Sequence, residues 1–132
     1  MYKLIELPKI LDPRGNLTFL QYPGHIEFEI ERVFWTYDVP GGEKRGGHAF
    51  KRQQEIIVAL SGSFDVIISL PDGKTERVPL NRSYYGLYIS ALTWRHMENF
   101  STNSLALHLA STSYDKTDYI YEFDEYKKLK FL

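Results

Sequence analysis

The stretch RGGHAFKRQQEIIVALSG, residues 45–62, decides the fold prediction for this chain. It begins with Arg45 and two glycines, places His48 and Phe50 two residues apart, and continues through Glu55 into an apolar segment that ends at Gly62. Alternate residues of a regular β-strand face the same side. The stretch therefore predicts a strand that turns an imidazole and an aromatic ring to one face, followed by a second strand.

Runs rich in Val, Ile, Tyr and Phe recur along the rest of the chain, and Gly, Pro, Asp and Asn separate them. Short strands at this spacing are typical of an all-β sandwich or barrel. The predicted strands are residues 2–7, 17–22, 28–39, 54–62, 63–70, 75–80, 84–90, 93–100 and 105–111.

Two further local signals complete the fold prediction. Asp72-Gly73, at the centre of LPDGK, predicts a tight hairpin turn. In residues 117–132, Tyr119, Phe123 and Tyr126 follow a helical spacing and the last positions are rich in lysine, which predicts a short C-terminal helix.

The composition indicates an ordinary globular protein. At 132 residues the chain suits a single domain spanning residues 1–132, and a net charge of −1 gives no reason to expect nucleic acid or membrane as a partner. The absence of Cys excludes disulfides, thiolate ligands and Cys nucleophiles. The first residues contain no signal-peptide core, so a cytoplasmic location is expected.

The spacing of His48, Glu55 and Gly62 resembles the first motif of the cupin barrels, in which His-x-His and Glu bind a metal. Phe50 stands where the second His would be, and its hydrocarbon ring cannot coordinate a cation. His48 and Glu55 alone are too few ligands for a tight site, and neither His96 nor His108 completes it at a clean spacing. We therefore expect an all-β cupin-type jelly-roll barrel with a short C-terminal helix and without a metal or other cofactor.

The chain also resembles a narrower family, the dTDP-4-dehydro-6-deoxyglucose 3,4-ketoisomerases. The resemblance is carried by DPRGNL, IERVFWTYDVP, RGGHAFK, ALSGS, GLYISALTW and STSYDKTDYIYEFDEYKK. It implies a metal-free isomerase that moves a ketone from C4 to C3 of a dTDP-linked 6-deoxyhexose through an enediol, toward a 3-amino sugar for surface polysaccharide. It also implies a homodimer that exchanges N-terminal strands.

This chain departs from the family pattern at its proton-transfer residues. The resemblance implies His48 as one acid/base group, whereas the second His of the pair is replaced by Phe50. The family pattern Trp-His-Glu-Met reads Trp94-Arg95-His96-Met97, so one hypothesis is that His96 supplies the second imidazole. The alternatives are a non-catalytic sugar-nucleotide binder and a 3,5-epimerase-type enzyme.

Several other side chains are candidates for the site. Arg14 and Arg45 suit phosphate or carbonyl oxygens, and Tyr37 is a candidate proton relay. Substrate binding is also considered for Glu55, which could orient an imidazole, and for Trp35 and Trp94, which could stack on thymine or sugar rings. Each of these could instead serve packing or solvation, and His25 and His108 are expected to be structural.

Overall fold

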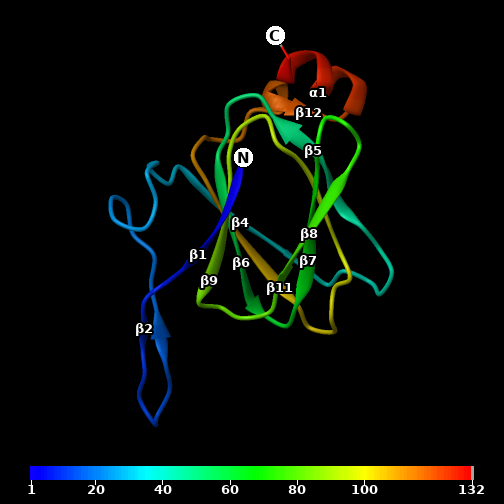
Figure 1. The fold of residues 1–132 in the computed structure, drawn as a ribbon. Helices are drawn as coiled ribbons and strands as arrows, with labels where there is room; N and C mark the ends of the chain where they lie inside the picture. The colour runs from blue at the N-terminus through cyan, green and yellow to red at the C-terminus, as the bar shows by residue number, and fades with distance from the viewer. Residues whose placement is uncertain (132) are drawn as a thin grey trace.

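The computed structural model describes residues 1–131, which form two five-stranded antiparallel sheets that face each other, with a helix at the C-terminal end (Figure 1). In sheet order, the first sheet consists of β1 (Tyr2–Glu6), β9 (Tyr85–Ile89), β6 (Glu55–Ser61), β11 (Leu105–Ala110) and β4 (Arg32–Tyr37). The second consists of β12 (Tyr119–Ile120), β5 (Arg45–Phe50), β10 (Trp94–Glu98), β7 (Phe64–Ser69) and β8 (Thr75–Leu80). We refer to them as sheet 1 and sheet 2.

A separate two-stranded hairpin lies outside both sheets. It pairs β2 (Lys9–Ile10) with β3 (Leu17–Thr18) and projects from the body of the molecule as an arm (Figure 1). We call residues 9–18 the N-terminal arm. It carries exposed Leu11 at its turn and is followed by a segment that returns to the outer face of sheet 1.

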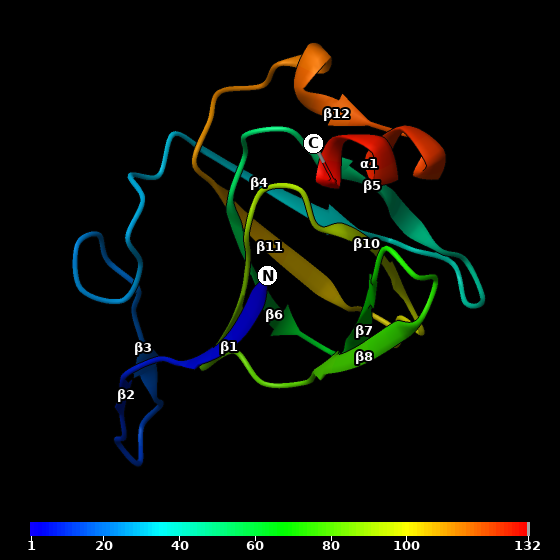
Figure 2. The same cartoon turned by 45° about the horizontal axis from the view of Figure 1, so that its top comes forward.

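The main core fills the space between the two sheets. Its buried members come from the inward faces of both sheets and include Ile57, Phe64, Val66, Leu87 and Met97. The outer face of sheet 1 is partly covered by Leu20, Ile26, Phe28 and Ile30, and the outer face of sheet 2 by α1 (Phe123–Lys130) (Figure 2). Because both faces of sheet 1 are covered in this region, β6 is almost continuously apolar after Glu55 instead of alternating.

The predicted all-β fold with a C-terminal helix is confirmed. Turn residues Asp72 and Gly73 join β7 to β8, and Asp72 accepts a hydrogen bond from the Lys74 amide as expected of this hairpin. The prediction for residues 17–22 is wrong in extent, because only Leu17 and Thr18 pair, and β2 and β12 were not predicted. Within residues 1–131, no helix has the length and apolar character needed to cross a membrane.

The tight turn between β6 and β7 predicts a specific response to substitution. Gly62 has a positive φ of 66°, and an added Cβ would lie 2.8 Å from the Ser104 Cα. Gly73 also has a positive φ, 91°, but faces open space. Gly62→Ala should therefore lower the free energy of unfolding by about 2–4 kcal/mol, against about 1 kcal/mol for Gly73→Ala. Urea denaturation of both variants measures this difference, and equal losses would show that backbone conformation alone matters at Gly62.

Candidate functional site

A cavity of about 240 Å³ opens between the two sheets. Sheet 1 supplies one wall and sheet 2 the other, so the site uses side chains from strands far apart in sequence. The residues that line it are Phe34, Thr36, Glu55, Ile57 and His108 from sheet 1, Arg45, Gly46, His48, Phe50, Arg95, Met97 and Tyr119 from sheet 2, and Tyr121.

A bulge in β5 places both Arg45 and His48 in this cavity. His48 pairs with Arg95 on β10, whereas Arg45 pairs with Met97, so the register shifts between the two pairs. Gly46 in the bulge has a φ of 77°. A Cβ at Gly46 would lie 3.4 Å from Cε1 of the His48 ring. In a regular strand, residues three apart face opposite sides, but a bulge reverses that parity. The two glycines at the start of the motif therefore bring a guanidinium and an imidazole to the same wall.

His48 stands in an aromatic corner of the cavity. Its ring lies edge-on to Phe50, with centroids 4.7 Å apart, and 5.4 Å from the ring centroid of Tyr119. Burial, together with the positive charge of Arg95, lowers the pKa of His48 to about 3. The imidazole is therefore neutral near pH 7 and can accept a proton from a bound molecule.

Phe50 and Arg95 pack directly against each other. The Arg95 guanidinium carbon lies 4.8 Å from the centroid of the Phe50 ring, a cation–π contact, and Arg95 is only 2% exposed. Its Nη1 donates to the Thr93 carbonyl at 2.9 Å, and its Nη2 donates to Glu55 Oε1 at 3.0 Å. The guanidinium is thus fixed in the floor of the site by a ring face, a carbonyl and a carboxylate.

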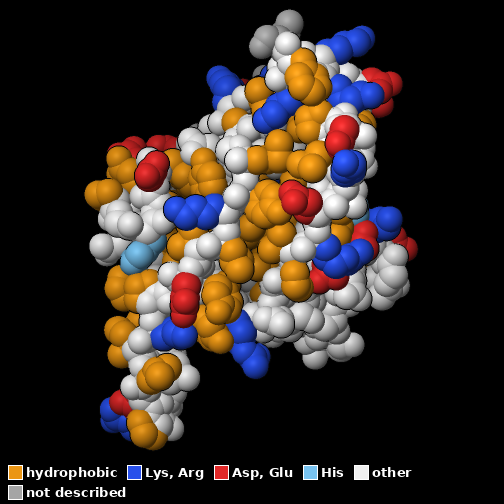
Figure 3. All heavy atoms as spheres, in the orientation of Figure 1, with side chains coloured by type: hydrophobic (Ala, Val, Ile, Leu, Met, Phe, Trp, Pro, Cys, Tyr) orange, Lys and Arg blue, Asp and Glu red, His pale blue; other side chains and the backbone are white. Residues whose placement is uncertain are grey.

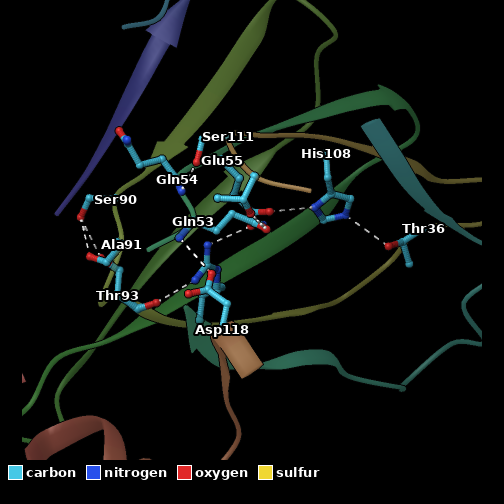
Figure 4. A network of polar contacts seen from close by, with 12 residues as sticks. Thr36, Gln53, Gln54, Glu55, Ser90, Ala91, Thr93, His108, Ser111 and Asp118 are labelled. Carbon is cyan, nitrogen blue, oxygen red and sulfur yellow. Dashed lines mark hydrogen bonds and ion pairs between the residues drawn. The ribbon is translucent and has the colours of Figure 1, made fainter. Parts of the chain in front are cut away.

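Glu55 is the central anion of the site. Burial alone would raise its pKa, but Arg95 and His108 outweigh that effect and lower the pKa to about 2. Glu55 Oε2 faces His108 Nδ1 at 3.7 Å, and His108 Nε2 lies 3.2 Å from the Thr36 hydroxyl (Figure 4). Glu55 therefore stays ionised and connects a cation from sheet 2 to an imidazole on sheet 1.

The structure brings His48, Arg45 and Glu55 into one cavity, as expected from the sequence, but it does not place His96 there. His96 lies on the outward face of β10, where its Nε2 is 2.7 Å from Glu98 Oε1. Residues 95 and 97 take the inward positions instead. The hypothesis that His96 replaces the missing imidazole is therefore wrong, because strand parity turns Arg95 to the interior and His96 away from it.

Four other candidates also lie outside the cavity. Trp94 shares the outward face of β10 and packs under α1 against Phe123 and Tyr126, away from the cavity. Trp35 and Tyr37 are 58% and 60% exposed on the outer face of β4.

Arg14 is on the projecting N-terminal arm, where it pairs with Asp12 at 3.0 Å. Arg14 therefore does not reach the cavity of its own chain.

Sequence reasoning missed three polar groups of the site, Arg95, Thr36 and His108. The sequence LALHLAS contained a signal for His108. Its leucines alternate with Ala106, His108 and Ala110, and the two small alanines on the same face as His108 leave room for a cavity. The leucines were the more obvious candidates for the interior, yet Leu107 and Leu109 pack beneath residues 20–30 on the outer face. His108, expected to be structural, instead lines the cavity.

The paired sheets and the cavity between them define a cupin-type barrel with an internal cavity. The family model described as "FdtA: WxcM-like, C-terminal" matches residues 1–131, and the chain belongs to this family. The predicted family and barrel type are thereby confirmed.

Individual relatives agree with this assignment. The chain is 39% identical over 127 residues to the TDP-4-oxo-6-deoxy-α-D-glucose-3,4-oxoisomerase of Aneurinibacillus thermoaerophilus, covering 96% of this chain and 90% of the relative. It is similar to the crystal structure of the sugar 3,4-ketoisomerase QdtA from Thermoanaerobacterium thermosaccharolyticum in complex with TDP, with a TM-score of 0.94, 36% identity and coverage of 99% and 97%. It is also similar to the structure of the TDP-quinovose 3,4-ketoisomerase WlaRB of Campylobacter jejuni, with a TM-score of 0.90 and 38% identity. The match covers 96% of this chain and 97% of WlaRB.

The buried histidine of the cavity predicts that acid destabilises the protein. In the unfolded chain His48 takes up a proton near pH 6.5, but in the folded protein only near pH 3. Between these values the unfolded state binds more protons, so the free energy of unfolding falls as pH falls, by up to about 1.4 kcal/mol per pH unit. Glu55, whose pKa is lowered from 4.5 to about 2, adds a loss of the same sign below pH 4.5.

Urea denaturation at pH 7, 6 and 5 checks this expectation. His48→Gln should flatten the dependence between pH 6 and 5, because glutamine has no proton to gain. His25→Gln, a change in the segment between the N-terminal arm and β4, is the control for loss of a histidine elsewhere. An unchanged slope in His48→Gln would contradict the assignment.

Proposed function

We propose that this chain is a sugar-nucleotide 3,4-ketoisomerase that converts a TDP-linked 4-keto-6-deoxyhexose into its 3-keto isomer. The observation that carries the proposal is a neutral imidazole, His48, beside an arginine-bearing wall in the interior cavity of a chain that is 39% identical to a 3,4-oxoisomerase. The reaction needs a base for the carbon-bound proton next to the ketone and positive charge near the oxygen that becomes an enediolate.

The cavity offers a group for each of these tasks. His48 is the base that takes the proton from C3 and returns it to C4, since its neutral form is present at pH 7. Arg95 lies in the floor of the same cavity and stabilises the developing negative charge. Arg45 stands at the start of β5 and is the cation that we assign to the diphosphate.

The aromatic residues of the cavity are suited to a ring-containing ligand. Tyr119 and Tyr121 stack with an interplanar angle of 15° and centroids 5.5 Å apart, and both line the cavity together with His48. Flat apolar faces bind a nucleobase or a sugar through contact area. In this proposal the aromatic groups and Arg45 bind the nucleotide sugar. His48 and Arg95 act on the reacting atoms.

Proton exchange measurements test the activity. The purified protein is incubated in D₂O with TDP-4-keto-6-deoxyglucose while NMR follows the sugar ring. Migration of the ketone to C3 is the expected result, and His48→Asn should reduce the rate at least about 100-fold while TDP binding, measured by calorimetry, changes little. Inversion at ring carbons without migration would indicate an epimerase, and no exchange with TDP binding retained would indicate a sugar-nucleotide binder.

We also propose that two chains form a homodimer by exchanging their N-terminal strands. The N-terminal arm exposes Ile10, Leu11 and Leu17 by 56%, 72% and 54%, and Figure 3 shows hydrophobic side chains on the projecting arm between charged ones. β4 lies at the edge of sheet 1, so its outer side has no strand partner within residues 1–131. An edge strand and an apolar arm are complementary features for strand addition between chains.

Exchange of this kind gives roles to candidates that lie outside the cavity. Trp35 and Tyr37, together with Val33, make the outer face of β4 apolar, and burial against a second chain would remove this surface from water. Arg14 sits at the turn of the arm with its side chain 91% exposed. In the dimer we expect it to approach the partner's cavity, where its guanidinium contacts the substrate.

Analytical ultracentrifugation tests the dimer. The parent protein should sediment as a dimer, whereas Ile10→Asp on the arm and Val33→Asp on β4 should shift it to monomer at micromolar concentration, because each places a charge in the proposed interface. Phe131→Asp is the matched control, since Phe131 is 75% exposed and follows α1 at the end of the molecule opposite the arm (Figure 1). A monomeric parent protein would refute the proposal.

A further inference from the structure

Three polar side chains form a line along the inner face of sheet 1. Thr36 lies on β4, His108 on β11 and Glu55 on β6, which are adjacent strands. His108 is the diagonal cross-strand neighbour of Thr36 on one side and of Glu55 on the other. The Thr36 hydroxyl is 3.2 Å from His108 Nε2, and His108 Nδ1 is 3.7 Å from Glu55 Oε2 (Figure 4). A hydroxyl, an imidazole and a carboxylate thus follow one another along the wall of the cavity.

The buried end of this line is not saturated by hydrogen bonds. His108 is 4% exposed and Glu55 is 2% exposed, yet neither His108 Nδ1 nor Glu55 Oε2 has a hydrogen-bond partner among the described residues. A buried polar atom without a partner is costly, and these two atoms face each other. The carboxylate favours the tautomer with hydrogen on Nδ1, which leaves Nε2 as the acceptor for the Thr36 hydroxyl.

The proposed isomerisation must move two protons, and His48 accounts for one. As the C3–H bond breaks, its electron pair forms the C3–C4 double bond and the carbonyl pair moves to O4. The proton passes to His48 and later to C4. The second proton starts on O3 and must finish on O4, so a separate carrier is needed for an oxygen-bound proton. Phe50 cannot serve, since a hydrocarbon ring has no titratable atom.

We infer that Thr36 and His108 are this second carrier, with Glu55 stabilising the charge that His108 gains; the inference rests on the proposed ketoisomerase function. As C4 takes the proton from His48, the O3–H proton passes to the Thr36 oxygen while the Thr36 hydroxyl proton passes to His108 Nε2. The O3–H electron pair becomes the C3 carbonyl. The same path in reverse then returns a proton to O4, so the protein regains its starting state.

The arrangement around Glu55 makes this transfer favourable. Oε1 is held by Arg95 Nη2 at 3.0 Å, which fixes the carboxylate, while Oε2 remains free to accept from His108 Nδ1. The positive charge that arises on His108 then lies beside an anion that is already ionised. In this path His108 takes up the proton through Thr36, and Thr36 is the side chain that contacts the substrate oxygen.

A purely structural role makes a different prediction. The His108 ring stacks on Phe34 with an interplanar angle of 4° and centroids 4.4 Å apart, so the ring also contributes to packing. Glutamine at position 108 can still donate to Glu55 and accept from Thr36, but it cannot carry a proton. If packing and hydrogen bonding were its whole role, His108→Gln would retain activity.

The experiment measures two rates in D₂O with TDP-4-keto-6-deoxyglucose: deuterium incorporation at C3 and migration of the ketone. His108→Gln should reduce kcat for migration at least about 100-fold with KM changed less than about threefold. Deuterium should still enter the unreacted substrate, since His48 is intact. His108→Gln with kcat within threefold of the parent value, or with equal losses in both rates, would overturn the inference.

Substitutions at position 36 test the same path without altering the imidazole. Thr36→Val removes the hydroxyl at nearly constant shape and should reproduce the His108→Gln pattern, whereas Thr36→Ser keeps the hydroxyl and should keep at least about a third of the activity. Full activity in Thr36→Val would also overturn the inference. His96→Asn, on the outward face of β10, is the histidine control and should match the parent protein.

The parent protein separates this inference from the proposed function. If the parent neither exchanges nor isomerises the substrate, the ketoisomerase function fails, and the role of His108 falls with it. If the parent isomerises and His108→Gln does so equally well, only the inference fails. Circular dichroism and urea denaturation of each variant establish that it is folded before its rates are compared.

Discussion

The buried ion pair between Glu55 and Arg95 is the interaction on which the site depends. It joins β6 of sheet 1 to β10 of sheet 2 through the interior, where each residue is only 2% exposed. A buried charge without its partner is strongly unfavourable, typically by about 3–5 kcal/mol. The two walls of the cavity are therefore held in one relative position by a contact that also determines its electrostatics, because Arg95 helps to lower the pKa values of both His48 and Glu55.

Phe50, Glu55 and Arg95 are held together around this contact. A guanidinium inside the barrel needs an anion, which Glu55 supplies, and the face of Phe50 at 4.8 Å accommodates its charge. An imidazole at position 50 would instead place a second cation-forming group against Arg95. The three residues therefore form one packed unit in the floor of the cavity.

The fold could be predicted from the sequence because local patterns specify it: alternation, the Asp72-Gly73 turn and the helical spacing after Tyr119 each depend on near neighbours. The site was only partly predictable. His48, Arg45 and Glu55 belong to one continuous motif, but the inward side of β10 and β11 depends on what covers their outer faces. Trp94 faces outward on β10 because α1 covers that face of sheet 2. Leu107 faces outward on β11 because residues 20–30 cover that face of sheet 1. Such coverage is set by tertiary contacts that strand periodicity does not contain.

Glu55 contacts both sheets of the site because its two carboxylate oxygens have different partners. Oε1 is engaged by Arg95, which prevents the carboxylate from rotating, and Oε2 faces His108. The pair Glu55–Arg95 is neutral as a unit, and Arg45 contributes the remaining positive charge of the cavity lining. A proton on His48 is opposed by Arg95, whereas a proton on His108 lies beside the carboxylate. His48 is therefore suited to pass its proton on to the substrate, and the second proton is carried next to Glu55.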